Sequence, residues 1–161
     1  MIKFFYSLLF LFSINNLWSI ELKCHFEEVY PDSVTQQGFL LIKNNSLRYQ
    51  YYDQNLFTIF AHKNRYFYNP NYQTSSFFKI EQNNIIIEKL LELALQYPNI
   101  ETEYFYDDYY LKIEKALTNT FIKRMSIKSA GLNVSIYFKN CVSDLLNDNL
   151  FGHFPYIEYH Y

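Results

Sequence analysis

The stretch from Gly38 to Thr74 constrains the fold most, because apolar side chains recur in it at every second position. The alternating positions are Leu40 and Ile42 in a first run, and Leu47, Tyr49 and Tyr51 in a second. Period two is typical of a pleated strand, whose successive side chains point to opposite faces. Asn-rich segments, which favour turns, separate the runs. The pattern therefore predicts several short antiparallel strands.

Similar signals continue along the chain. We expect strands at 21–29 and 76–81, and two hairpins over 103–113 and 121–138. Asp107-Asp108 forms the turn of the first hairpin, and Ala130-Gly131 that of the second. Neither a repeat nor a second domain is apparent, so residues 20–161 are expected to form one domain.

One helix is predicted over Asn84–Tyr97, ending before Pro98. Its apolar face is wide, which requires a second apolar surface to pack on. Evenly spaced antiparallel strands with so apolar a helix indicate a sheet that curls and is closed by its helix, which forms a lid. The expected lid side chains are Ile86, Leu90 and Leu93, whereas Glu88, Lys89, Glu92 and Gln96 are expected to face solvent.

Residues 1–19 are expected to be a signal peptide. Lys3 precedes an apolar run from Phe4 to Phe12, which is shorter than the about 20 residues that span a bilayer. A retained N-terminal membrane anchor is the alternative. Cys24 follows charged residues rather than a lipobox, so we expect an unanchored protein in the periplasm.

The composition disfavours several classes of function. The chain has 17 Tyr and 16 Phe but 3 Gly, and its formal net charge is −2, which gives no reason to expect a nucleic-acid partner. A Gly-rich phosphate loop and a Gly-x-Ser-x-Gly motif are both missing from the sequence, and the four histidines are scattered. We therefore expect neither an enzyme, a cofactor nor a metal site.

Cys24 and Cys141 are the two cysteines of the chain. In an exported protein such a pair is readily oxidised, and a disulfide closing so long a loop would contribute roughly 4 to 5 kcal/mol in the chain-entropy model. Two unpaired buried thiols are the alternative, because sequence alone does not place the two Cα atoms at bonding distance.

The order of motifs resembles the LolA family, the periplasmic carriers of outer-membrane lipoproteins. The elements that carry this resemblance lie mainly between residues 38 and 73, with a second, weaker group near the C-terminus. They are Gly38, Leu40, Ile42-Lys43, Leu47-Arg48-Tyr49, Tyr51, Tyr66 to Pro70 and Gln73, followed by Asn140, Asp148, Leu150-Phe151 and Pro155. The Arg-Pro turn that is common in this family is replaced by Asn44-Asn45, so its lid latch does not carry over.

The resemblance implies an α+β fold, in which an incomplete, strongly curled antiparallel β-barrel is covered by a helical lid. It also implies a carrier that binds the acyl chains of lipoproteins inside this barrel. It further implies an inner-membrane ABC transporter as donor and an outer-membrane acceptor, with the carrier acting as a monomer and without covalent chemistry. The cavity side chains expected on the concave face of the sheet are Leu40, Ile42, Leu47, Tyr49, Tyr51, Phe57, Ile59 and Phe67. The competing hypothesis is a small exported β-domain with a filled core that acts as a protein-interaction module.

Overall fold

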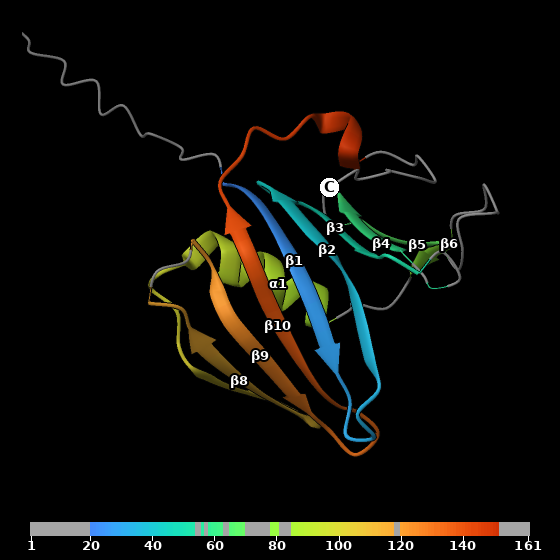
Figure 1. Cartoon of the computed structure of the whole chain (residues 1–161), viewed down its shortest axis with the longest axis vertical. Coiled ribbons are helices and arrows are strands. Elements are labelled where there is room, and N and C mark those ends of the chain that lie inside the picture. Colours follow the sequence, from blue (N-terminus) through green and yellow to red (C-terminus); the bar gives the residue numbers. More distant parts are fainter. Residues whose placement is uncertain are drawn as a thin grey trace, which may run out of the picture.

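The computed structural model describes residues 20–53, 56, 58–62, 65–69, 78–80, 85–117 and 120–151, without the side chains of 60–62, 65–67, 69, 78–80 and 85. These residues form one antiparallel sheet with a single α-helix on one face (Figure 1). The strands are β1 (Glu21–Val29), β2 (Thr35–Lys43), β3 (Ser46–Tyr51), β4 (Thr58–His62), β5 (Arg65–Asn69), β6 (Phe78–Ile80), β7 (Glu103–Tyr106), β8 (Tyr109–Lys115), β9 (Ile122–Lys128) and β10 (Asn133–Val142). The helix is α1 (Ile85–Gln96), and a 3-10 helix, η1, covers Asp148–Phe151.

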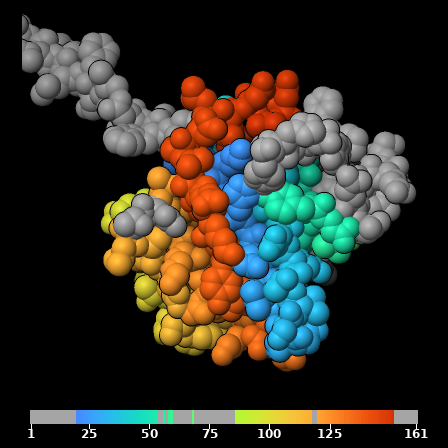
Figure 2. All heavy atoms as spheres, viewed as in Figure 1, coloured from blue at the N-terminus to red at the C-terminus, as the bar shows by residue number. Residues whose placement is uncertain are grey.

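The strand order is β6-β5-β4-β3-β2-β1-β10-β9-β8-β7, so the sheet consists of two meanders. Strands β1 to β6 form one and β7 to β10 the other, and the pairing of β1 with β10 joins them. In Figure 2, side chains of β1 and β10 run beside each other over the face opposite α1. The connection from β6 to β7 must cross from one edge of the sheet to the other, and α1 lies on this crossing.

Among the described residues, helix α1 packs into the larger of two hydrophobic clusters, which also contains inward side chains of β1, β2, β3, β8, β9 and β10 and which we call the main core. Ile87, Leu90 and Leu93 are at most 1% exposed and pack in one cluster with inward side chains of β1, β3 and β10. Lys89 is also buried: its Nζ lies 3.8 Å from the centre of the Tyr104 ring and donates to Glu92. The expectation that Lys89 faces solvent is therefore wrong, because the β7–β8 hairpin covers it with tyrosine rings.

The predicted α+β class, with a barrel covered by a helical lid, is also wrong. The described residues are mostly strand in one open sheet, whose end strands β6 and β7 do not pair with each other within this part of the chain. One α-helix is present among them, and its side chains Ile87, Leu90 and Leu93 are buried in the main core rather than resting on a closed barrel. The individual strands and the helix lie close to their predicted positions.

Strand β2 is buried on both faces from Gly38 to Ile42. Leu40 and Ile42 point into the main core, whereas Phe39 and Leu41 contact a second, smaller cluster with Leu146 and Phe151. The segment after β10 therefore covers the outer face of β2 and β3. Arg48, on the outer side of β3, is fully buried there and donates to Gln50 Oε1 (2.6 Å) and to the carbonyl oxygen of Leu150 (3.0 Å).

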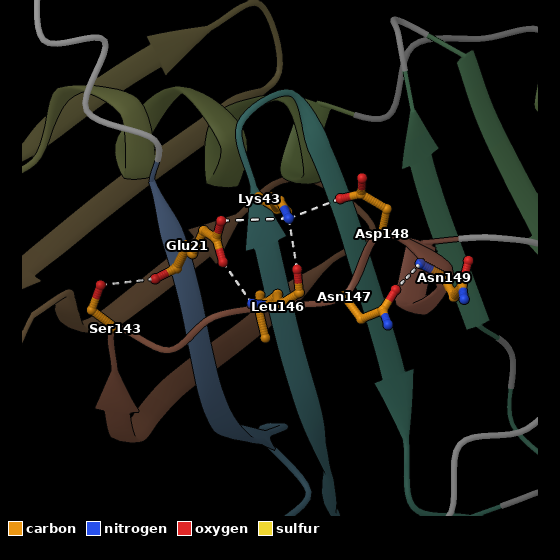
Figure 3. Close-up of polar contacts among 7 residues, drawn as sticks. All are labelled: Glu21, Lys43, Ser143, Leu146, Asn147, Asp148 and Asn149. Atoms are coloured by element: carbon orange, nitrogen blue, oxygen red, sulfur yellow. Dashed lines mark hydrogen bonds and ion pairs between the residues drawn. The ribbon is translucent and has the colours of Figure 1, made fainter.

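Polar contacts hold this C-terminal segment at the ends of β1 and β2 (Figure 3). Lys43 Nζ donates to the carbonyl oxygen of Leu146 (2.6 Å) and lies 2.8 Å from Asp148 Oδ1 and 3.4 Å from Glu21 Oε1. The backbone N–H of Leu146 donates to Glu21 Oε2 (2.5 Å), and Ser143 Oγ donates to the carbonyl oxygen of Glu21 (3.1 Å).

A disulfide joins β1 and β10 between Cys24 and Cys141, the pairing that the sequence suggested. The register of the two strands shifts at this point, because Cys24 of β1 stands opposite two residues of β10, Asn140 and Cys141. Asn140 takes up the extra residue with a φ of 51°, a conformation that asparagine tolerates better than most residues.

No helix among the described residues has the length and apolarity needed to cross a membrane. The expected signal peptide, residues 1–19, lies outside the described residues.

Candidate functional site

A cavity of about 170 Å³ lies between the sheet and α1. Apolar side chains form most of its wall, together with three tyrosines and one carboxylate. Its lining residues are Glu28, Tyr30, Tyr49, Tyr51, Ile59, Ile86, Ile87, Leu132, Val134 and Ile136. Tyr30, Ile86 and Leu132 are only half-buried, so we place the mouth of the cavity beside them.

The strand register explains how these side chains meet. Tyr49 and Tyr51 are two residues apart on β3 and therefore share one face, and Ile59 stands directly opposite Tyr49 on β4. On the other side of β1, Ile136 of β10 stands opposite Glu28. The cavity thus spans the pairing that joins the two meanders.

Glu28 is the polar centre of the cavity wall and is 5% exposed. Tyr49 donates to its Oε1 (2.6 Å), Tyr30 donates to its Oε2 (2.7 Å), and the Tyr51 hydroxyl lies 3.0 Å from both oxygens. We call these four residues the Glu28–tyrosine cluster.

The tyrosines of this cluster stay protonated. Burial raises the pKa of Tyr49 well above its ordinary value, and the negative charge of Glu28 raises it further. The pKa values of Tyr51 and Tyr30 are raised by the same two causes, burial again being the larger. All three hydroxyls therefore act as hydrogen-bond donors to the carboxylate at neutral pH.

Phe26 supports the cluster from the next inward position of β1. Its ring stacks on that of Tyr49, with the centres 4.0 Å apart, and meets Tyr51 edge-on at 5.3 Å. Tyr49 and Tyr51 are themselves in a T-shaped contact at 5.7 Å. Such contacts fix the positions of the Tyr49 and Tyr51 rings, so that both hydroxyls converge on one carboxylate.

The predicted site residues divide into three groups. Tyr49, Tyr51, Ile59 and the lid residue Ile86 line the cavity. Buried in the main core but not on the cavity wall are Leu40, Ile42, Leu47, Leu90 and Leu93. Phe57 lies outside the described residues, and Phe67 lies in β5 without a described side chain.

Sequence reasoning missed Glu28, Tyr30, Ile87, Leu132, Val134 and Ile136. A signal for Glu28 was present, because it continues the inward alternation of Leu22, Cys24 and Phe26 on β1. Val134 and Ile136 gave a strand pattern, but only the pairing of β10 with β1 brings them to this cavity.

The arrangement is suited to binding. Within the described residues, the titratable side chains that line the cavity are one carboxylate and three protonated tyrosines, and no group of three or more His, Cys, Asp or Glu is placed to hold a metal ion. The comparisons assign no family: no family model matches the chain, and no curated protein matches it significantly.

Proposed function

We propose that this protein binds an acyl chain, or a comparable apolar group, in the cavity between the sheet and α1. The observation that carries the proposal is the apolar wall of that cavity, to which Tyr49, Tyr51 and Ile59 contribute. Ligand sites are typically concave and apolar with a few convergent polar groups, and the Glu28–tyrosine cluster supplies such groups.

The size of the cavity limits what it holds. An apolar cavity of about 150 Å³ accepts benzene, so 170 Å³ corresponds to about six carbon atoms. The cavity therefore accommodates the end of one acyl chain. A lipoprotein carries more apolar volume than this, and its binding would require α1 to move away from the sheet.

The resemblance to LolA extends the proposal to a role. In this role the protein is exported to the periplasm, takes acyl chains of lipoproteins from an inner-membrane ABC transporter and delivers them to an outer-membrane acceptor. No bond of the cargo is made or broken. Transfer requires only that the acceptor bind the chains more tightly than the carrier does.

Calorimetric titration with alkan-1-ols of increasing length tests binding in the cavity. Each buried CH₂ contributes about 0.8 kcal/mol, so affinity is expected to rise about fourfold per carbon up to about six carbons and then to level off. A rise that continues to long chains would indicate that α1 moves.

A cavity-filling variant locates the binding. Val134→Phe places a ring in the cavity and is expected to abolish alkanol binding, whereas Val142→Phe makes the same change at an exposed position of β10 and should leave it intact. Equal binding by both variants, or no binding by the unmodified protein, would contradict the proposal and favour the interaction module with a filled core.

A further inference from the structure

Glu28 occupies a position that the sheet otherwise reserves for apolar side chains. Leu22, Cys24 and Phe26 are the other inward residues of β1, and all are at most 3% exposed. A buried carboxylate is costly, and an apolar residue of similar size commonly gives equal or greater stability. Packing alone therefore does not account for a glutamate here.

The charge of Glu28 is solvated by hydroxyl groups but not neutralised. Its hydrogen-bond donors are Tyr30, Tyr49 and Tyr51, and within the described part of the chain no lysine, arginine or histidine forms an ion pair with it. The cavity beside it is otherwise lined by uncharged side chains. A negative charge thus faces a small apolar space.

The cluster also has an acceptor position to spare. A carboxylate offers about four lone-pair sites, and the three tyrosines bring three hydroxyl protons, of which that of Tyr51 is shared between both oxygens. A donor from a ligand can take one of the two sites between which the Tyr51 proton is shared.

We propose that the cavity selects ligands whose polar end is a protonated amine, such as an alkylammonium ion, with the ammonium group on Glu28 and the alkyl part against Ile59, Val134 and Ile136. This inference rests on the proposed function, because it concerns the same cavity. An ammonium group supplies three donors and the missing positive charge, and tyrosine rings at the wall add to its attraction. An anionic head group meets a like charge instead.

Three probes that share a six-carbon chain separate the head group from the apolar part: hexylammonium, hexan-1-ol and hexanoate. Titration calorimetry at pH 7 is expected to give hexylammonium at least about tenfold higher affinity than hexan-1-ol, since hydrogen bonds to charged groups are the stronger ones. Hexanoate is expected to bind least.

The variant Glu28→Gln keeps the shape of the side chain and removes its charge. We expect it to lower hexylammonium affinity at least about tenfold, to the level of hexan-1-ol, while hexan-1-ol binding stays unchanged. Glu27→Gln is the matched control, because Glu27 is the neighbouring glutamate of β1 and contacts Lys139 and Gln37 away from the cavity. It should leave all three affinities unchanged.

The possible outcomes distinguish this inference from the proposed function. Equal binding of the three probes, or a preference for hexylammonium that persists in Glu28→Gln, would overturn the inference while leaving the apolar site in place. Failure of hexan-1-ol and hexylammonium alike to bind would overturn both. The three-probe comparison on the unmodified protein remains decisive even where Glu28→Gln does not fold.

Discussion

Gly38 is a position at which neighbouring atoms leave no room for a side chain. It stands opposite Phe26 on β1 and Tyr51 on β3. A Cβ atom at this position would lie 2.1 Å from the carbonyl oxygen of Gln50 and 2.5 Å from the Phe26 ring. The missing side chain is therefore what allows Phe26 to lie flat beside Tyr49 and support the Glu28–tyrosine cluster.

We expect Gly38→Ala to destabilise the protein by about 2 kcal/mol or more, because the added methyl group overlaps backbone atoms that cannot move alone. Gly131→Ala is the control, since nothing lies within 4 Å of a Cβ there. Its effect should be neutral or slightly stabilising. Urea unfolding of both variants measures the difference, and equal stabilities would contradict the packing described around Phe26.

Tyr49 makes the stability of the folded protein fall as the pH rises in the alkaline range. Because burial raises its pKa in the folded protein above the ordinary 10.0, the unfolded chain loses this proton first as the pH rises. Stability is therefore fully present below pH 10 and falls above it, by about 1.4 kcal/mol per pH unit for each such tyrosine.

Tyr49→Phe should lower stability at pH 7 by about 1.5 to 3 kcal/mol, since it removes a hydrogen bond to a charged group. Above pH 10 its stability should fall less steeply than that of the unmodified protein. The two slopes should differ by the contribution of one proton, about 1.4 kcal/mol per pH unit. Denaturant unfolding between pH 8 and 11 measures both slopes. Parallel curves would show that the Tyr49 hydroxyl is not the buried donor described.

At the scale of elements, the pairing of β1 with β10 holds the sheet together. It is the junction between the two meanders, and Cys24 and Cys141 make it covalent. These cysteines are separated by 117 positions, so the disulfide closes nearly the whole described chain into one loop. Removing this disulfide raises the conformational entropy of the unfolded chain more than removing a crosslink between residues close in sequence would.

We expect Cys24→Ala/Cys141→Ala to lose about 4 to 5 kcal/mol of unfolding free energy, and reduction of the unmodified protein to have a similar effect. Amide exchange should rise first at the paired residues of β1 and β10. A loss below about 1 kcal/mol, with unchanged exchange there, would show that the strands hold together without the disulfide.

The elements themselves could largely be predicted from the sequence, because their signals are local. The inward alternation of β1 and β3, the turn at Asp107 and the helix before Pro98 depend on neighbouring residues alone. The role of α1 could not be predicted from the sequence. Its wide apolar face indicates that the helix packs on an apolar surface, but not whether that surface is a filled core or the rim of a barrel.

The site was less predictable, because its walls come from segments far apart in the chain. Tyr49, Tyr51 and Ile59 belong to one meander and were found by alternation, whereas Val134 and Ile136 reach them only through the pairing of β10 with β1. Glu28 continues the inward alternation of β1, but a glutamate that follows Glu27 is ordinarily expected to face solvent. The burial of Arg48 under η1 likewise depends on the C-terminal segment.

At the scale of the whole molecule, the two faces of the sheet have different roles. The C-terminal segment covers part of the outer face through Leu146 and Phe151, and polar contacts of Lys43 fix it there. The inner face carries α1, the main core and the cavity. A ligand that enters on the side of α1 would therefore not disturb the smaller cluster of Phe39, Leu41, Leu146 and Phe151 on the outer face.

Methyl NMR of the isotope-labelled protein with hexan-1-ol tests the proposed binding site most directly. If the alkyl chain binds in the cavity, intermolecular nuclear Overhauser effects are expected from it to methyl groups of Ile59, Ile87, Val134 and Ile136, which line the cavity. Exposed Leu117 and Leu145 should show none. Contacts confined to such exposed leucines, or no contacts at a saturating concentration, would contradict the claim that this cavity is the binding site.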